Sequence, residues 1–283
     1  MGAAESKLSF KKGVFRLFEE PNISPADPYW LQFWELPENV ADLFSLFGPT
    51  DIRRTRDTSL ENLETLIMAT CSKLFAMRRN PSFPDVETAP ANHALNCIRV
   101  LTRIMPYVYE KESLARWQTK FFWSSRRRKV RGNSLGDNEV LFDPEMEEHI
   151  TEDPSESFET VQPLGAELVD TLSDLLFFSG FTLPSMGSKP EKVNYVIWET
   201  GVGCTVPIGT SKEMDSNKAE ILRLLLTLMS APMYLEPTTM PDSELPWLNY
   251  IVCCSEKKKV LCILCSLLNT VSYFADTCAY SRP

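Results

Sequence analysis

The residues best suited to chemistry in this sequence lie at its N-terminus, where Gly2 is followed at short range by Ser6 and Lys7. This spacing is the pattern of N-myristoylation, because the transferase needs a free glycine amine after Met1 is removed and fits a small hydroxyl side chain further along its peptide channel. The pattern therefore predicts an acyl chain on Gly2. The alternative is a chance match, since short N-terminal patterns recur in unrelated proteins.

A single myristoyl chain gives only reversible membrane binding, with an association constant of roughly 10⁴ M⁻¹, so a second signal is expected. Basic residues near an anionic leaflet add about 1 kcal/mol each. The candidate membrane-contact residues in this chain are Lys7, Lys11, Lys12 and Arg16.

Apolar residues share one helical face beside these basic residues: Phe10, Val14, Leu17 and Phe18. Two interpretations stay open. The segment is an amphipathic helix that lies on a membrane behind the acyl chain, or it is a first helix docked on the core of the protein with a solvated basic side.

Other catalytic or metal-binding patterns are weak. Cys262 and Cys265 form the only CxxC pair, but they lie in an apolar helical stretch, so we expect buried free thiols rather than a redox or zinc site. Only two histidines occur, His93 and His149, in different segments, and no glycine-rich phosphate loop is present. The sequence predicts no enzyme, no cofactor, no metal site and no small-molecule substrate.

The composition excludes several classes of protein. With 283 residues and 43% hydrophobic content the chain can form a substantial core, and a formal net charge of −9 argues against a general nucleic-acid binder. No apolar run is long enough to span a bilayer, and the N-terminus lacks the hydrophobic region of a signal peptide. We expect synthesis in the cytosol, where the eight cysteines stay free thiols.

Hydrophobic residues recur at helical spacing through most of the chain, and no set of strands with alternating residues stands out. The predicted helices include residues 59–79, 91–105, 164–178, 214–229 and a final pair at 247–254 and 257–271. The fold class is therefore all-α, with antiparallel helix pairs compatible with an α-solenoid of the armadillo or HEAT type and a long disordered insertion. A dense aromatic group is expected to pack the first helices together rather than bind a peptide: Tyr29, Trp30, Phe33 and Trp34.

Composition divides the chain into an N-terminal signal and basic helix (1–20), a helical region (21–125), a charged flexible insertion (126–162), a second helical region (163–272) and an atypical tail (273–283). The insertion opens with a basic run and continues with many carboxylates. The run could import the protein into the nucleus or contact lipid. The preferred interpretation is a flexible loop whose two ends neutralise each other.

Several separate blocks resemble one family, the high-temperature-induced dauer-formation proteins, which belong with the dymeclins. The blocks are the start of the chain with its basic helix, NCIRVLTRIMPYVYE at 96–110, Phe121-Phe122-Trp123, YVIWETGVG at 195–203, EILRLLLTLMSAPMYL at 220–235, and residues 266–271. The likeness runs in order from Gly2 to about Val271.

The resemblance implies a non-catalytic, N-myristoylated scaffold on the cytoplasmic face of Golgi and trans-Golgi membranes, with a cytosolic pool, acting in protein sorting and secretory vesicle biogenesis. Its implied partners are an anionic membrane surface and Golgi trafficking proteins. Only Gly2 carries over as a modified residue. The alternative is a soluble cytosolic or nuclear helical-repeat interaction protein without a lipid anchor.

Family members continue far beyond this length, and the tail at 273–283 does not resemble them. A truncated isoform or fragment would leave an open end of the helical array. We then expect exposed apolar surface and reduced solubility around four leucines: Leu261, Leu264, Leu267 and Leu268.

Overall fold

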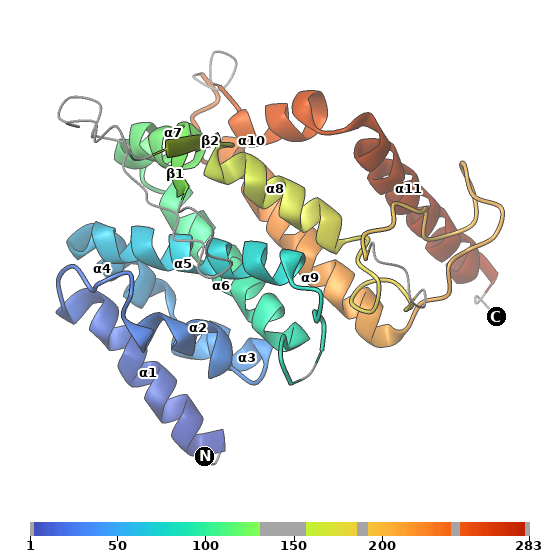
Figure 1. Ribbon diagram of the computed structural model, residues 1–283. Helices are drawn as coiled ribbons and strands as arrows, with labels where there is room; N and C mark the ends of the chain where they lie inside the picture. Colours follow the sequence, from blue (N-terminus) through green and yellow to red (C-terminus); the bar gives the residue numbers. More distant parts are fainter. Residues whose placement is uncertain (1–2, 86, 131–156, 186–191, 239–243, 281–283) are drawn as a thin grey trace.

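The computed structural model is built almost entirely of α-helices, which confirms the all-α prediction. It describes residues 3–85, 87–130, 157–185, 192–238 and 244–280 (Figure 1). The helices are α1 (Ala3–Glu19), α2 (Gln32–Glu35), α3 (Val40–Leu46), α4 (Pro49–Thr58), α5 (Leu60–Arg79), α6 (Ala91–Tyr109), α7 (Ala115–Trp123), α8 (Leu164–Leu175), α9 (Lys212–Met229), α10 (Pro246–Asn249) and α11 (Lys257–Tyr280).

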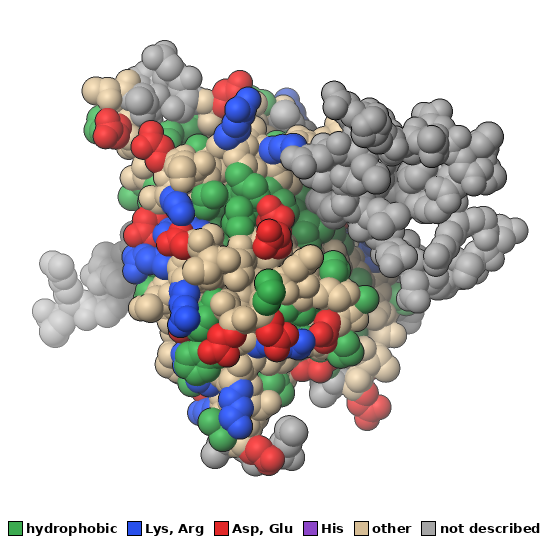
Figure 2. Space-filling view, turned by 90° about the vertical axis from the view of Figure 1, so that its left-hand side faces the viewer, with side chains coloured by type: hydrophobic (Ala, Val, Ile, Leu, Met, Phe, Trp, Pro, Cys, Tyr) green, Lys and Arg blue, Asp and Glu red, His purple; other side chains and the backbone are tan. Residues whose placement is uncertain are grey.

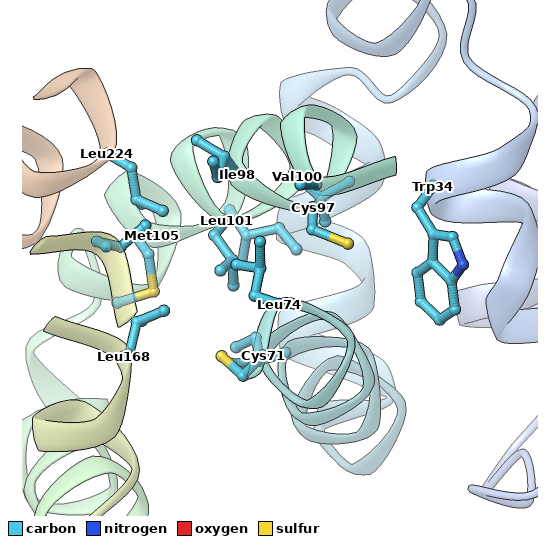
Figure 3. Packing of buried hydrophobic residues seen from close by; sticks show 14 of the residues in the cluster. Trp34, Cys71, Leu74, Cys97, Ile98, Val100, Leu101, Met105, Leu168 and Leu224 are labelled. Carbon is cyan, nitrogen blue, oxygen red and sulfur yellow. The ribbon is translucent and has the colours of Figure 1, made fainter. Parts of the chain in front are cut away.

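Helix α6 lies at the centre of the core, between the N-terminal helices and α9 (Figure 3). Cys97, Leu101 and Met105 of α6 are fully buried, and they face Leu74 of α5 and Leu224 of α9 across the core. The helix runs through Pro106 to Tyr109, further than the sequence predicts. Proline removes one backbone hydrogen bond, but the turn that follows it buries Val108 and Tyr109, so packing outweighs that loss.

The predicted aromatic group packs the first helices together. Tyr29, Trp30, Phe33 and Trp34 are all buried, and Phe10 of α1 meets Phe33 edge to face with ring centroids 5.7 Å apart. Aromatic pairs of this geometry add about 0.5–1.5 kcal/mol to the burial of their surface. This packing fixes the position of α1 against α2 and α3.

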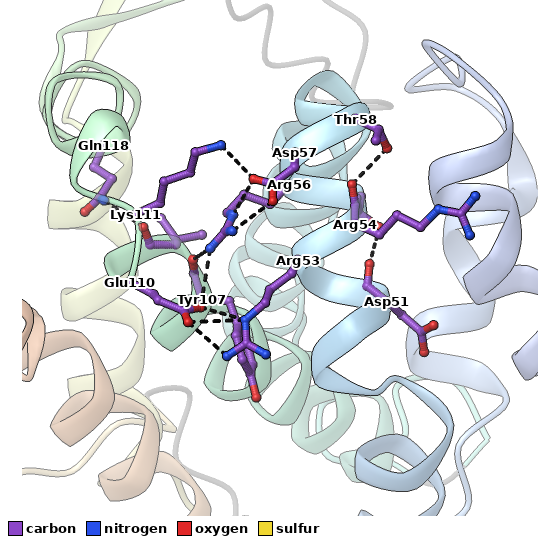
Figure 4. A network of polar contacts seen from close by, with 12 residues as sticks. Asp51, Arg53, Arg54, Arg56, Asp57, Thr58, Tyr107, Glu110, Lys111 and Gln118 are labelled. Carbon is purple, nitrogen blue, oxygen red and sulfur yellow. Dashed lines mark hydrogen bonds and ion pairs between the residues drawn. The ribbon is translucent and has the colours of Figure 1, made fainter.

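A polar network joins α4 to the end of α6 (Figure 4). Arg53 forms a bidentate ion pair with Glu110, and Arg56 donates to the carbonyl oxygen of Tyr107 at 2.8 Å. Asp57 accepts from Arg56 and from Lys111, at 2.9 and 2.7 Å. These contacts link α4 to the end of α6, with Arg56 buried and its partners Asp57 and Glu110 exposed.

The insertion is entered and left through an antiparallel pair of strands, β1 (Arg126–Val130) and β2 (Ser157–Val161), with Arg126 opposite Val161. The sequence predicts no strand here. The basic run therefore begins as a β-strand. Its first side chain, Arg126, is buried and lies 2.5 Å from a carboxylate oxygen of Glu167 on α8, which compensates its charge. The remainder of the predicted flexible insertion, residues 131–156, lies outside the described residues.

Helix α11 holds the irregular segment around Trp198 through two polar side chains. Ser266 accepts from the backbone N–H of Trp198 at 3.2 Å, and Asn269 contacts the turn at Gly201 and Val202. Gly201 has a φ of 147°, and an added Cβ there would lie 2.5 Å from the Asn269 side chain. The turn therefore requires glycine at this position.

Candidate membrane-contact surface on the N-terminal helix

Helix α1 is docked on the protein core through its apolar face. Val14 and Leu17 are fully buried, Phe10 is 1% exposed and Phe18 is 8% exposed. Burial of each such side chain is worth about 1.5–3 kcal/mol. Of the two arrangements that the sequence leaves open, the structure shows the docked helix. The apolar face of α1 is therefore not the surface that could meet a membrane in this fold.

Close backbone contact holds the middle of α1 against the segment that follows it. The hydroxyl of Tyr29 donates to the carbonyl oxygen of Gly13 at 2.7 Å. A Cβ added to Gly13 would lie 1.8 Å from the side-chain oxygen of Gln32. Glycine at this position leaves room for the end of the Gln32 side chain against α1.

Two of the predicted membrane-contact lysines form ion pairs within the protein. Lys7 lies 2.8 Å from a carboxylate oxygen of Asp42, whose side chain is 7% exposed, and this hydrogen bond raises the pKa of Lys7. Lys11 lies 2.8 Å from a carboxylate oxygen of Asp51 and donates to the carbonyl oxygen of Leu46 at 2.9 Å. Both lysines thus connect α1 to α3 and α4.

Arg16 is also engaged inside the protein. Its guanidinium contacts the carboxylates of Glu20 and Asp27 at 2.7 and 3.0 Å, and it lies over the ring of Tyr29. The hydrogen bond to Glu20 raises the pKa of Arg16, and the backbone N–H of Tyr29 lowers the pKa of Asp27. A lipid phosphate would have to compete with two carboxylates for this side chain.

Lys12 differs from the other three predicted residues. It is exposed, and it forms no ion pair with any residue that the structure describes. Arg54 of α4 is exposed as well, and within the described ranges it has no carboxylate partner either. Sequence reasoning missed Arg54, because only the packing of α4 on α1 brings it to this surface.

The face of the molecule that carries α1 combines several kinds of side chain (Figure 2). Hydrophobic and basic side chains lie among acidic ones over its lower part. Leu8 and Phe15 of α1 are exposed by 58% and 38%. Gly2, the predicted acylation site, lies outside the described residues, so its modification stays a prediction.

The remaining chemical candidates do not converge. Cys262 and Cys265 are half-buried on α11 rather than buried as expected, and Cys262 packs against the edge of the core. Burial lowers the pKa of His93, whereas His149 lies outside the described residues. Where side chains are described, no group of three or more His, Cys, Asp or Glu residues could hold a metal ion.

A cleft of about 160 Å³ opens between the end of α6, α7 and the segment before α10. Its lining includes Tyr109, Glu112, Trp123, Met229 and Trp247. No helix among the described residues combines the length and apolar character needed to cross a bilayer.

Comparison with known proteins identifies relatives along the whole chain. Residues 1–281 match the model of the family described as High-temperature-induced dauer-formation protein. The chain is 34% identical to the Ubp5-interacting protein ftp105 of Schizosaccharomyces pombe over 323 aligned residues, covering 95% of this chain and 34% of that protein. It is 34% identical to human Protein HID1 over 295 residues, covering 100% of this chain and 34% of the human protein.

A second Schizosaccharomyces pombe relative, a Hid-1 family protein, is 32% identical and is matched over 97% of this chain and 30% of its own length. The chain therefore spans about a third of the length of these curated relatives. Comparison with solved structures gives no match.

Proposed function

Because the chain belongs to the high-temperature-induced dauer-formation protein family, we propose that it is a non-catalytic, N-myristoylated peripheral membrane protein. In this proposal it acts as a scaffold in protein sorting and secretory vesicle biogenesis on the cytoplasmic face of the Golgi and trans-Golgi network. Its partners are an anionic membrane surface and trafficking proteins. A cytosolic pool follows from the reversibility of a single acyl anchor.

The observation that carries this proposal is the extent of the family match, which begins at residue 1 and so includes the Gly2 pattern and helix α1. The described part of α1 starts at Ala3 and is docked through its apolar face. An acyl chain on Gly2 would therefore be attached to the body of the protein through a rigid helix, with almost no linker between them.

The relatives are about three times as long as this chain. A role of a full-length relative is therefore only a proposal for this chain. The ftp105 protein is named for its interaction with Ubp5. That name supports an interaction protein over an enzyme. We propose that this chain likewise acts by binding other proteins.

Intact mass spectrometry of the N-terminus, on protein made in its own cytosol with only a C-terminal tag, tests the anchor directly. Fluorescence microscopy and membrane flotation then compare the wild type with Gly2→Ala and with Ser9→Ala, a control outside the acylation pattern. We expect a myristoyl adduct on the wild type and on Ser9→Ala, both at Golgi membranes. Gly2→Ala is expected to be cytosolic.

A free or acetylated N-terminus, together with an unchanged distribution of Gly2→Ala, would contradict the proposal. It would favour the alternative of a soluble cytosolic or nuclear interaction protein without a lipid anchor. Nuclear accumulation that is lost when the basic residues at 127–131 are neutralised, with the buried Arg126 kept, would then identify the nuclear form of that alternative.

A further inference from the structure

The solvent-facing side of α1 carries three residues in a row along the helix: Leu8, Lys12 and Phe15. Their spacing places them on one helical face, opposite the buried residues that dock α1 on the core. Leu8 is 58% exposed and Phe15 is 38% exposed, so this side presents apolar surface to solvent although the helix is already packed.

Basic groups surround this apolar surface. The guanidinium of Arg54 lies 4.3 Å from the ring centre of Phe18, which meets Phe15 edge to face at 5.7 Å. The Lys11 ammonium lies 4.8 Å from the ring centre of Phe15. We call Leu8, Lys12, Phe15 and Arg54 the α1 outer patch.

The two cations of this patch are available to an outside ligand. Lys12 and Arg54 form no ion pair with the residues that the structure describes, whereas Lys7, Lys11 and Arg16 do. Two exposed carboxylates, Glu5 and Glu19, lie on the same side toward the two ends of the helix. They limit the favourable contact with an anionic surface to the middle of α1.

We infer that the α1 outer patch is the surface through which the folded protein contacts an anionic lipid membrane, an inference that rests on the proposed membrane function. Leu8 and Phe15 would enter the boundary between headgroups and acyl chains, and Lys12 and Arg54 would contact lipid phosphates. Of the four basic residues that the sequence suggests for membrane contact, the inference keeps Lys12. Lys7, Lys11 and Arg16 are left out because they form ion pairs with carboxylates of the protein.

Charge complementarity favours a membrane over a protein helix as the occupant. The exposed stripe on α11 (Leu261, Leu264, Leu268 and Val271) has a cation only beside its first turn, at Lys257, and its remaining described residues are apolar, which suits an apolar partner. The α1 outer patch instead places two cations beside two exposed apolar side chains, the two kinds of group through which interfacial helices bind anionic lipid. It also lies on the helix that begins directly after Gly2.

Vesicle flotation with the full chain tests the inference, using the acylated protein and, separately, the unacylated Gly2→Ala background with the lipid concentration titrated. Vesicles contain phosphatidylcholine alone or phosphatidylcholine with phosphatidylserine. The test variants are Leu8→Gln/Phe15→Gln and Lys12→Gln/Arg54→Gln. Matched controls make the same chemical changes on exposed residues elsewhere: Leu264→Gln/Leu268→Gln and Arg116→Gln/Lys257→Gln. Circular dichroism confirms that each variant is folded.

Each charge removed from the patch should weaken partition onto phosphatidylserine vesicles about fivefold, with little change on phosphatidylcholine. The Leu8→Gln/Phe15→Gln change should weaken partition about tenfold on both kinds of vesicle. The control variants should match the wild type.

If the acylated wild type floats and the patch variants float equally well, the inference is wrong while the lipid anchor stands. If acylation adds no flotation, the proposed anchor fails, and the lipid titration in the Gly2→Ala background still decides the inference. In that background, a loss of vesicle binding that is confined to the patch variants supports the inference. Equal binding by all variants, or none by any, overturns it.

Discussion

The side-chain amide of Asn62 donates a hydrogen bond of 2.8 Å to the backbone carbonyl of Leu17, which ties α5 to the C-terminal end of α1. The same amide donates to the carbonyl of Glu20 and accepts from the N–H of Ile23. Asn62 is fully buried. One side chain therefore satisfies backbone groups that the end of a helix leaves unpaired.

Replacing Asn62 with alanine should loosen α1 from the core. Buried backbone groups left without partners cost about 1–3 kcal/mol each, so we expect the free energy of unfolding to fall by at least about 2 kcal/mol. Urea denaturation of Asn62→Ala measures this change. Thr65→Ala on the same helix is the control and should differ little from the wild type, because the half-buried Thr65 hydroxyl bonds only to the carbonyl of Glu61 one turn earlier. Equal stability of Asn62→Ala and the wild type would contradict the proposed role of this side chain.

The network between α4 and α6 predicts a dependence of stability on acid. Hydrogen bonds from Arg56 and Lys111 hold the pKa of Asp57 well below its ordinary value near 3.8. A carboxylate with a lowered pKa stabilises the fold above that ordinary value, and the contribution is lost as the pH falls through the lowered pKa. Because the Asp57 carboxylate is exposed to solvent, its ion pairs are worth at most about 1 kcal/mol.

We therefore expect Asp57→Asn to melt below the wild type at neutral pH and to approach it as the pH falls below about 4, toward the lowered pKa. Scanning calorimetry across this pH range measures the difference. Glu112→Gln, which changes a nearby exposed carboxylate outside the network, should show no such convergence. A constant gap between Asp57→Asn and the wild type would contradict the argument.

The described thiols should react with iodoacetamide in the order of their exposure. Cys253 is exposed, whereas burial raises the pKa of the Cys71 thiol to about 12 and raises that of Cys97. Only the thiolate reacts with iodoacetamide. Cys71 and Cys97 are therefore protected both by their burial and by their raised pKa. Peptide mass mapping under native conditions should find Cys253 labelled first, with Cys71 and Cys97 labelled only after unfolding. Equal rates for Cys71 and Cys253 would be incompatible with this structure.

The exposed stripe on α11 should make the chain self-associate. Leu261, Leu264 and Leu268 are 50%, 51% and 59% exposed, as expected for an uncovered helical face; Leu267 is partly buried, unlike the other three. Replacing the three exposed leucines with glutamine should keep the melting temperature and raise the concentration at which the protein stays monomeric. Light scattering after size exclusion measures this, with Met233→Gln as a control for a single exposed residue. An unchanged association state would contradict the role of the α11 stripe in self-association.

Much of the helical framework could be predicted from hydrophobic spacing. The predicted helix at 59–79 is observed as Leu60–Arg79, and the aromatic group around Trp30 and Phe33 forms core, as expected. These features depend on residues close together in sequence, whose apolar positions repeat with the helical period. The extension of α6 beyond Pro106 could not be predicted, since it depends on how well the last turn is buried.

The candidate site was less predictable, because it depends on contacts between distant residues. Nothing in the local pattern pairs Lys7 with Asp42, which lies on another helix, or places Arg54 beside Phe18. The strand pair at Arg126 was also missed, since a basic run lacks the alternation of a half-buried strand.

The two exposed apolar surfaces lie far apart, with α1 at the lower left of Figure 1 and α11 at its right. A molecule held on a bilayer through α1 would keep α11 away from the lipid, facing the aqueous phase. All bound molecules would share this orientation, so a membrane would display the α11 stripes as a two-dimensional array. Confinement of this kind raises effective concentration without any new contact, and a partner that engages several stripes would sense their surface density rather than the total amount of protein.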